Sequence, residues 1–201
     1  MTQVVDPWRL QASLMEKSGQ AMPEGPTLTL AALTYMALQL EELAELANAV
    51  GEAMPQADQL SAVWGSMSDD ERGSLLGVSV ALSTVQDAMN HSSLRIRRCV
   101  ADLKNSQFQS FPLATQDAVE ILDGVTDLMV TAAGFSLAAG LPGPEGFAEV
   151  SRSNLSKANP LTGRIDKDPS GKWIKGVSYA PPDLMGVLDQ QGQDNINHHR
   201  V

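Results

Sequence analysis

Two clusters of carboxylates, far apart in the chain, carry the side chains most able to do chemistry. Their members are Glu41, Glu42 and Glu45 in the first cluster and Glu120, Asp123 and Asp127 in the second. In a helix these spacings place the members of each cluster on neighbouring positions of one face. Carboxylates embedded among apolar residues repel one another and lose hydration. Such clusters are therefore rare inside a helical bundle unless a cation compensates their charge. Because Mg²⁺ prefers oxygen ligands, the pattern predicts a metal site, with a solvated helix face as the alternative for either cluster alone.

Long helices must position these carboxylates, and the composition of the chain favours helices over strands. Aromatic residues make up only 4% of the chain, so the β-branched and aromatic runs typical of strands are scarce. The first carboxylate helix is expected to begin at Thr27, as its N-cap, and to end near Val50 before Gly51. The second is expected over residues 115–139. The fold class predicted is therefore all-α, a helical bundle.

Further helices are expected around these two. They cover residues 4–18, 68–89, 94–103 and 144–157. A capping box of Ser68 with Glu71 starts one of them, and a break is expected near Asn90-His91. With 201 residues, one domain over 1–189 is the natural expectation. Residues 190–201 are expected to form a flexible polar tail.

The charge of the chain limits its partners. Fourteen Lys and Arg against 24 Asp and Glu give a net charge of −10, which does not suit nonspecific binding to nucleic acid or to an anionic membrane. The single Cys99 excludes an intrachain disulfide and fits a reducing compartment. No apolar run is expected to reach the ~20 residues that a membrane span needs, and the amino terminus lacks a signal-peptide pattern, so a cytoplasmic location is expected.

The segment 150–180 departs from this acidic character. It contains two acidic side chains, Asp166 and Asp168, against six basic ones. The basic residues are Arg152, Lys157, Arg164, Lys167, Lys172 and Lys175. Six minus two gives +4 in a protein of −10, so this is where an anionic ligand is expected to bind. Its glycines and prolines predict loops, with a small hairpin around Lys172-Trp173-Ile174.

In their order along the chain, these motifs resemble the MazG-type all-α nucleoside triphosphate pyrophosphohydrolases, and most closely the phosphoribosyl-ATP-pyrophosphohydrolase-like branch. The motifs are Glu41-Glu42-x-x-Glu45, Glu120-x-x-Asp123, Ser153–Lys157, Asp166–Lys172, Lys175-Gly176 and Tyr179–Leu184. The resemblance covers residues 4–50 and 115–185. That family joins its two carboxylate helices by a short connection, so residues 51–114 are interpreted as an insertion or an enlarged helical hairpin.

The resemblance implies a Mg²⁺-dependent enzyme, with Mn²⁺ as a substitute, that cleaves a nucleoside triphosphate or related nucleotide between its α and β phosphates. Glu42, Glu45, Glu120 and Asp123 would bind the metal directly, with Glu41 and Asp127 as direct or outer ligands. Glu41 or Glu45 would accept the proton of the attacking water. The substrate would be held by Asn154, Lys157, Lys172, Lys175 and Tyr179, the last by stacking on the base.

Other interpretations remain open. The positive charge of Lys157 could simply interact favourably with the dipole at the carboxyl-terminal end of a helix. Tyr179, which is followed by Ala180 and two prolines, could serve packing alone. The whole chain could be a catalytically silent helical protein that binds metal or a partner, or a hydrolase of phosphoribosyl-ATP or an alarmone. Small residues over 132–139 permit close helix packing, so a homodimer or homotetramer is expected.

Overall fold

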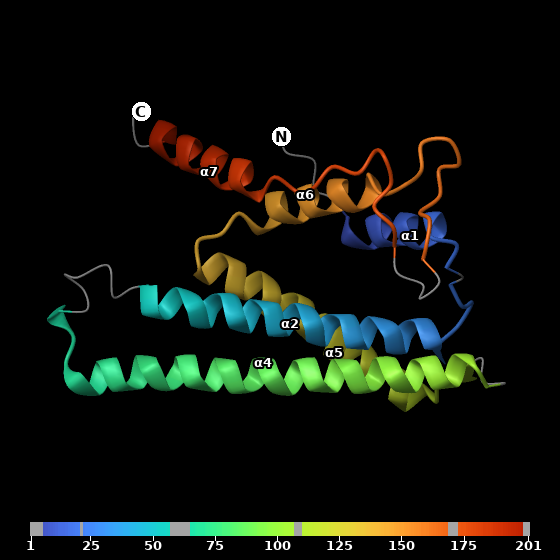
Figure 1. Cartoon of the computed structure of the whole chain (residues 1–201), viewed down its shortest axis with the longest axis horizontal. Helices are drawn as coiled ribbons and strands as arrows, with labels where there is room; N and C mark the ends of the chain where they lie inside the picture. Colours follow the sequence, from blue (N-terminus) through green and yellow to red (C-terminus); the bar gives the residue numbers. More distant parts are fainter. Residues whose placement is uncertain (1–5, 21, 57–64, 107–109, 169–172, 199–201) are drawn as a thin grey trace. The chain divides into compact units, whose positions relative to one another are not determined.

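The computed structural model describes residues 6–20, 22–56, 65–106, 110–168 and 173–198 (Figure 1). The described chain is mostly helical, which confirms the all-α fold class. Its helices are α1 (Pro7–Lys17), α2 (Leu30–Gln56), α4 (Asp69–Lys104), α5 (Thr115–Ala138), α6 (Gly143–Leu155) and α7 (Leu184–His198). Two short strands, β1 (Thr27–Thr29) and β2 (Ser110–Pro112), pair antiparallel.

The chain divides into two compact units, each described here by itself. The first, which we call the hairpin unit, is residues 25–113 and contains α2, α4 and both strands. The second, which we call the terminal unit, joins residues 1–24 with 114–201 and contains α1, α5, α6 and α7. The single domain expected over 1–189 stays a prediction.

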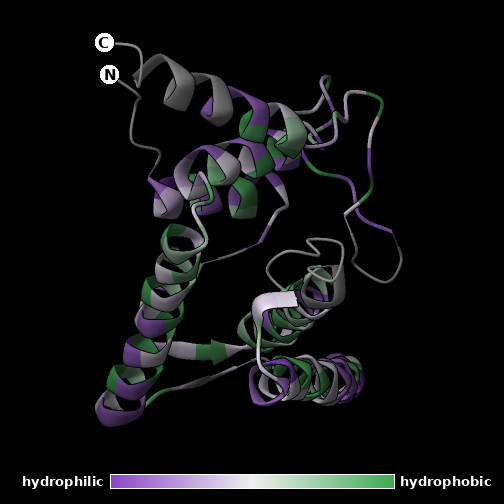
Figure 2. Cartoon of the chain, turned by 90° about the vertical axis from the view of Figure 1, so that its left-hand side faces the viewer, coloured by the Kyte–Doolittle hydropathy of each residue, from purple (hydrophilic) through white to green (hydrophobic). Residues whose placement is uncertain are grey.

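The hairpin unit is an antiparallel pair of long helices, seen nearly end-on and side by side in Figure 2. The residues of α4 that face α2 recur at alternating spacings of four and three, the pattern of a coiled-coil seam. They are Leu75, Ser79, Leu82, Gln86, Met89, Ser93, Ile96, Val100 and Leu103. The matching positions on α2 are Leu30, Leu33, Ala37, Leu40, Ala44, Ala47 and Gly51. All of these side chains are buried or partly buried.

Small residues hold the two helices close together. Ala37 and Ala44 on α2 are fully or almost fully buried, at 0% and 1% exposure, and Ser93 on α4 is also fully buried. With no long side chains between them, the two backbones approach closely along the seam. At the open end, Thr27 pairs with Pro112 and Thr29 with Ser110, so the two strands join the start of α2 to the end of α4.

The limits of α2 differ from those expected. Thr27 belongs to β1, and its hydroxyl donates to the carbonyl of Gly25 (3.0 Å), so it does not cap the helix. The capping oxygen is that of Thr29, which accepts from the N–H of Ala32 (3.1 Å). The helix also continues through Gly51 to Gln56. From the sequence, Gly51 was expected to end the helix, because glycine has a low helix propensity. Its packing against α4 offsets that low propensity.

The break expected near Asn90-His91 is wrong, since α4 is one continuous helix of 36 residues. The seam continues through Met89 and Ser93 on either side of it, so packing against α2 keeps this stretch helical. The start of α4 is confirmed. The hydroxyl of Ser68 accepts from the N–H of Glu71 (3.3 Å), and the Glu71 carboxylate accepts from the N–H of Ser68 (2.7 Å), which completes the capping box.

In the terminal unit, α5 begins at the expected residue and ends one residue early, before Gly140 with its positive φ of 65°. Helix α6 covers most of the expected 144–157. Helix α7 reaches His198, so most of the expected polar tail is helical. The amide of Gly186 donates to the Asp183 carboxylate (2.9 Å), which caps its start.

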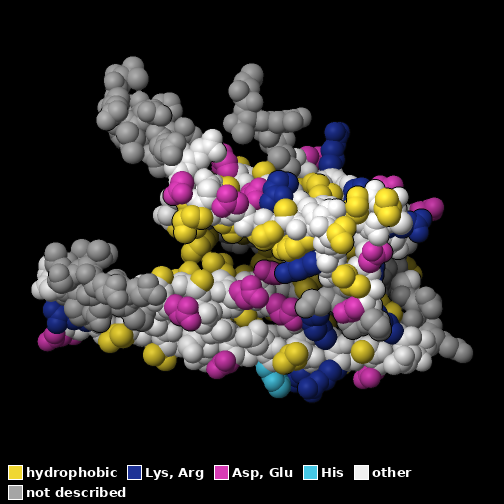
Figure 3. All heavy atoms as spheres, turned by 45° about the horizontal axis from the view of Figure 1, so that its top comes forward, with side chains coloured by type: hydrophobic (Ala, Val, Ile, Leu, Met, Phe, Trp, Pro, Cys, Tyr) yellow, Lys and Arg dark blue, Asp and Glu magenta, His cyan; other side chains and the backbone are white. Residues whose placement is uncertain are grey.

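Helix α5 has no buried residue. Its largest exposed apolar side chains include Leu122, Val130 and Leu137. On the face of the molecule drawn in Figure 3, hydrophobic side chains lie among charged ones. Among the described helices, α5 alone is long and apolar enough to cross a membrane, a criterion that core helices of soluble proteins also meet. No such segment was expected from the sequence, in which Asp123 and Asp127 interrupt the apolar run.

Candidate functional site

The end of α6 and the segment that follows it bring together four of the five predicted substrate-binding residues. The side-chain oxygen of Asn154 accepts a hydrogen bond from the ammonium of Lys157 (2.7 Å). That ammonium lies 5.7 Å from the centre of the Trp173 ring, and the ammonium of Lys175 lies 4.8 Å from the centre of the Tyr179 ring. We call these five residues the lysine cluster. Lys172, also predicted to bind substrate, lies outside the described residues.

Backbone contacts fold this segment back on itself and so position the cluster. The hydroxyl of Ser156, the C-cap residue of α6, accepts from the N–H of Ala180 (2.9 Å). The N–H of Tyr179 donates to the carbonyl of Gly176 (3.0 Å). Gly176 also lies against the carbonyl of Lys157, which a side-chain carbon there would approach to 3.5 Å. These bonds bring Lys157 and Tyr179, 22 residues apart, to one place.

A second set of contacts holds the strip that carries Trp173. Lys167 and Trp173 form an isolated antiparallel bridge, and the N–H of Ile174 donates to the carbonyl of Asp166 (2.9 Å). The hairpin expected around Trp173 is therefore present as a single bridge, although residues 169–172 of its turn lie outside the described residues. The strip is joined to α1 by the N–H of the buried Ile165, which donates to the carbonyl of Lys17 (2.9 Å).

The electrostatics of the cluster suit an anion. Partial burial lowers the pKa of Lys157, and the nearby charge of Lys175 lowers it further, while Tyr179 acts in the opposite direction. Two ammonium groups held near one another, of which that of Lys157 is partly desolvated, gain from a negative ligand between them. The ammonium of Lys157 bonds the Asn154 side chain, so its contacts go beyond an interaction with the helix end.

Glu41, in the first carboxylate cluster, is occupied by contacts across the helical hairpin. The hydroxyl of Ser93 donates to one of its carboxylate oxygens (2.8 Å), and the guanidinium of Arg97 forms an ion pair with the other. Ser93 is fully buried, so its hydroxyl depends on Glu41 as a partner. This arrangement gives Glu41 a structural role between α2 and α4, whether or not it also serves a metal.

Glu42 and Glu45 lie on the flank of α2 and are exposed. Loss of hydration raises the pKa of Glu42, and the charges of Glu45 and Glu41 raise it further. The negative charge of these carboxylates is thus only partly compensated by Arg97. Surplus negative charge on carboxylate oxygens attracts a hard divalent cation.

The second carboxylate cluster lies on exposed positions of α5. Glu120 accepts a hydrogen bond from the amide of Gln116 (3.1 Å), one helical turn away. Within the described ranges, no group of three or more His, Cys, Asp or Glu is placed to hold a metal ion. Since α2 and α5 belong to different units, the convergence of the two clusters stays a prediction.

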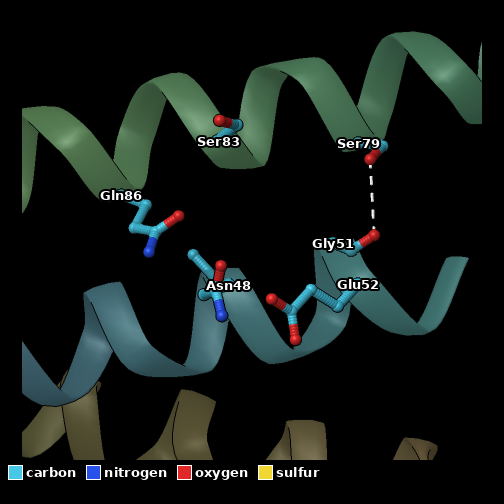
Figure 4. Close-up of a pocket in the computed structure, with 7 residues that line it drawn as sticks. Asn48, Gly51, Glu52, Ser79, Ser83 and Gln86 are labelled. Carbon is cyan, nitrogen blue, oxygen red and sulfur yellow. Dashed lines mark hydrogen bonds between the residues drawn. The ribbon is translucent and has the colours of Figure 1, made fainter.

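A groove between α2 and α4 was not predicted from the sequence (Figure 4). It has a volume of about 270 Å³. Its lining consists of Ala47, Asn48, Gly51, Glu52, Ser79, Ser83 and Gln86. The signal that could have revealed it is the seam spacing of α4, which places the polar Ser79 and Gln86 at positions that a coiled coil normally fills with apolar residues.

We compared the chain with known proteins. No family model matches it, and neither a curated protein nor a solved structure does. The likeness to MazG-type enzymes therefore rests on the motifs of the sequence.

Proposed function

We propose that this protein is a Mg²⁺-dependent nucleotide pyrophosphohydrolase that cleaves a nucleoside triphosphate, or a related nucleotide, to a monophosphate and pyrophosphate. The observation that carries the proposal is the lysine cluster. It places two ammonium groups, an amide and two aromatic rings within one folded segment, as the phosphates and base of a nucleotide require. The order of motifs, with acidic helices before a basic loop, supports the same activity.

Within this proposal each group of residues has a distinct task. Lys157 and Lys175 hold the phosphate chain as point charges, and Asn154 orients Lys157 through their hydrogen bond. Glu42, Glu45, Glu120 and Asp123 are the proposed metal ligands, with Asp127 beside them. Bound Mg²⁺ would supply neutralisation of phosphate charge and acidification of a water molecule.

Glu45 is the better candidate for the general base. Both Glu41 and Glu45 were predicted for this task, but Glu41 is engaged by Ser93 and Arg97. These two contacts take up the carboxylate oxygens of Glu41, so they are less available to accept the proton of a water molecule. Glu45 stands one turn further along α2, on its exposed flank.

The test is release of pyrophosphate from a panel of ribo- and deoxynucleoside triphosphates in Mg²⁺, with phosphoribosyl-ATP and an alarmone added to the panel. We expect turnover of at least one compound and none after chelation of the metal. Glu45→Gln should reduce kcat by about 10²-fold or more, the usual contribution of a general base, and should weaken Mg²⁺ binding while helicity by circular dichroism is unchanged. Full activity in this variant would remove Glu45 from the site.

A second variant tests the lysine cluster. Lys157→Ala removes one point charge from the proposed phosphate site, so we expect KM to rise about tenfold with a much smaller change in kcat. Lys104→Ala, at the end of α4, is the matched control because it removes an equal charge elsewhere. An unchanged KM in Lys157→Ala would contradict the phosphate-binding role.

The engagement of Glu41 favours one other candidate, a catalytically silent helical protein that binds metal or a partner. In that case the acidic residues of α2 stabilise the packing of α2 against α4, as the contacts of Glu41 with Ser93 and Arg97 do. The same panel distinguishes the two. No pyrophosphate from any compound, with Mg²⁺ binding demonstrated by titration calorimetry, would favour the silent protein.

A further inference from the structure

One face of α6 holds the segment that precedes α7. Three side chains, at spacings of three and then four residues along this face, each bond the backbone of residues 180–183. The bonds are those of Glu149 with the N–H of Asp183 (2.7 Å), of Arg152 with the carbonyl of Pro181 (2.9 Å) and of Ser156 with the N–H of Ala180 (2.9 Å). Together they fix the register of this segment along the helix.

Of these three contacts, that of Ser156 lies at the lysine cluster. Its hydroxyl donates to the carbonyl of Ser153 (2.7 Å), so its oxygen remains able to accept from the N–H of Ala180. Ser156 directly precedes Lys157, and Ala180 directly follows Tyr179. The bond therefore joins the end of α6 to the returning segment beside the residues that make up the cluster.

Each ammonium group of the cluster is supported within its own half. At the end of α6, the ammonium of Lys157 donates to the side chain of Asn154 (2.7 Å). In the returning segment, the ammonium of Lys175 lies 4.8 Å from the centre of the Tyr179 ring. Partial burial lowers the pKa of Lys157, and the charge of Lys175 lowers it further, so the two ammonium groups lie near one another. Their separation depends on the contacts between the halves, among which the bond of Ser156 lies at the cluster itself.

We propose that Ser156 is a positioning residue that spaces Lys157 and Lys175 for two successive phosphate groups, so that the cluster selects a chain of phosphates over a single phosphate. The inference rests on the proposed function for the choice of phosphate as the ligand. One phosphate group bonds the ammonium of Lys157, and a second group adds a charge-assisted hydrogen bond from Lys175. Without the bond of Ser156 the second ammonium keeps its charge but loses its place, so the advantage of the longer anion falls.

The experiment measures binding of orthophosphate, pyrophosphate and tripolyphosphate to the full chain by titration calorimetry. A chelator is present throughout, so that no divalent cation contributes to binding. We expect the two longer anions to bind at least about tenfold more tightly than orthophosphate, as one additional charge-assisted hydrogen bond implies. Orthophosphate that binds the wild-type chain as tightly as pyrophosphate would overturn the inference.

Ser156→Ala tests the positioning bond. It should lower the preference for pyrophosphate over orthophosphate by about tenfold. The affinity for orthophosphate should stay unchanged, because Lys157 and Asn154 remain. Ser156→Thr retains a hydroxyl and should retain the preference. Ser18→Ala is the matched control, because Ser18 is the C-cap residue of α1 and its hydroxyl likewise donates to a carbonyl three residues earlier, that of Met15 (2.9 Å).

A double variant separates positioning from a general loss of stability. Lys175→Ala, at an exposed residue, should remove the preference to the same extent as Ser156→Ala. The variant that carries both changes should show no further loss, because Ser156 acts through the place of Lys175. Losses that add in the double variant, or an undiminished preference in Ser156→Ala, would overturn the positioning role.

The two proposals fail separately. Pyrophosphate release from a nucleotide, with a KM that Ser156→Ala leaves unchanged, would leave the pyrophosphohydrolase intact and remove Ser156 as a positioning residue. Selective binding of pyrophosphate that depends on Ser156, without hydrolysis of any nucleotide, would support the positioning role and contradict the enzyme.

Discussion

Glu149 lies at the junction between α6 and the segment that precedes α7. Its carboxylate accepts from Nε and Nη2 of Arg152 (2.8 and 2.7 Å) and from the N–H of Asp183 (2.7 Å). Arg152 in turn donates to the carbonyl of Pro181 (2.9 Å). The pair therefore attaches the segment before α7 to α6. These hydrogen bonds, first from Arg152 and then from the Asp183 backbone, lower the pKa of Glu149 to about 2.

This shift predicts how stability depends on pH. The pKa of Glu149 is lower in the folded than in the unfolded chain, so the charged carboxylate stabilises the fold above the unfolded value of about 4.5. That contribution declines as pH falls from 4.5 toward 2. Glu149→Gln should therefore lower the free energy of unfolding at pH 7, and the difference from wild type should shrink at pH 3.

Urea denaturation at both pH values measures this difference. Asp189→Asn, which alters an exposed carboxylate of α7, is the control and should show no comparable pH dependence. A Glu149→Gln deficit that is the same at pH 7 and pH 3 would contradict the assignment of the shift to this carboxylate.

At the site, the contacts that could follow from the sequence are those between residues close together in the chain. Asn154 and Lys157 are three residues apart at the end of a helix, and Gly176 with Tyr179 forms a turn, so their grouping follows local rules. The partner of Glu41 is different. Arg97 is 56 residues away on another helix, and only the register of α2 against α4 brings the two together.

At the scale of elements, tertiary packing determines where two of the helices continue through residues that have a low helix propensity. The Asn90-His91 stretch favours a helix end by residue type, yet α4 passes through it because the seam continues. Gly51 is helical for a similar reason. Capping boxes and apolar spacing are local signals, so the start of α4 and the extent of α5 were predicted well.

The close approach of α2 and α4 predicts a large penalty for added volume. Ala44 is 1% exposed in the seam, and Ala44→Leu would force the helices apart, at a cost of about 1–3 kcal/mol. Ala49→Leu, on the exposed side of α2, should change stability by less than about 0.5 kcal/mol. Thermal and urea denaturation of the two variants compare them directly. Equal stability of the two would mean that the seam is looser than described.

At the scale of the whole molecule, the distribution of carboxylates over two units sets the main question of function. Glu42 and Glu45 belong to the hairpin unit, while Glu120 and Asp123 belong to the terminal unit. Sequence spacing predicts a shared face within one helix but carries no information on how two units dock. For that reason the metal centre stays a prediction.

The exposed apolar side chains of α5 predict self-association. Leu137 is 77% exposed near the end of a helix that has no buried residue, so a second copy of the chain would gain by covering it. We expect sedimentation to give a multiple of the 21.4 kDa chain mass, and Leu137→Glu to shift it toward one chain. Leu161→Glu is the matched control, because Leu161 is 94% exposed in a loop of the same unit. A wild-type protein that sediments as a single chain would contradict the predicted homodimer or homotetramer.

The two-stranded ladder has a consequence for how the hairpin unit tolerates damage. Its helices are connected covalently at one end, between α2 and α4, and by the backbone hydrogen bonds of β1 and β2 at the other. A protease that cut the chain just before Ser68 would leave the ladder, the seam and the Glu41–Arg97 pair in place. Two fragments would then stay associated as a nicked but native-like assembly, so the connection between α2 and α4 is a place where the chain could be opened and new termini introduced.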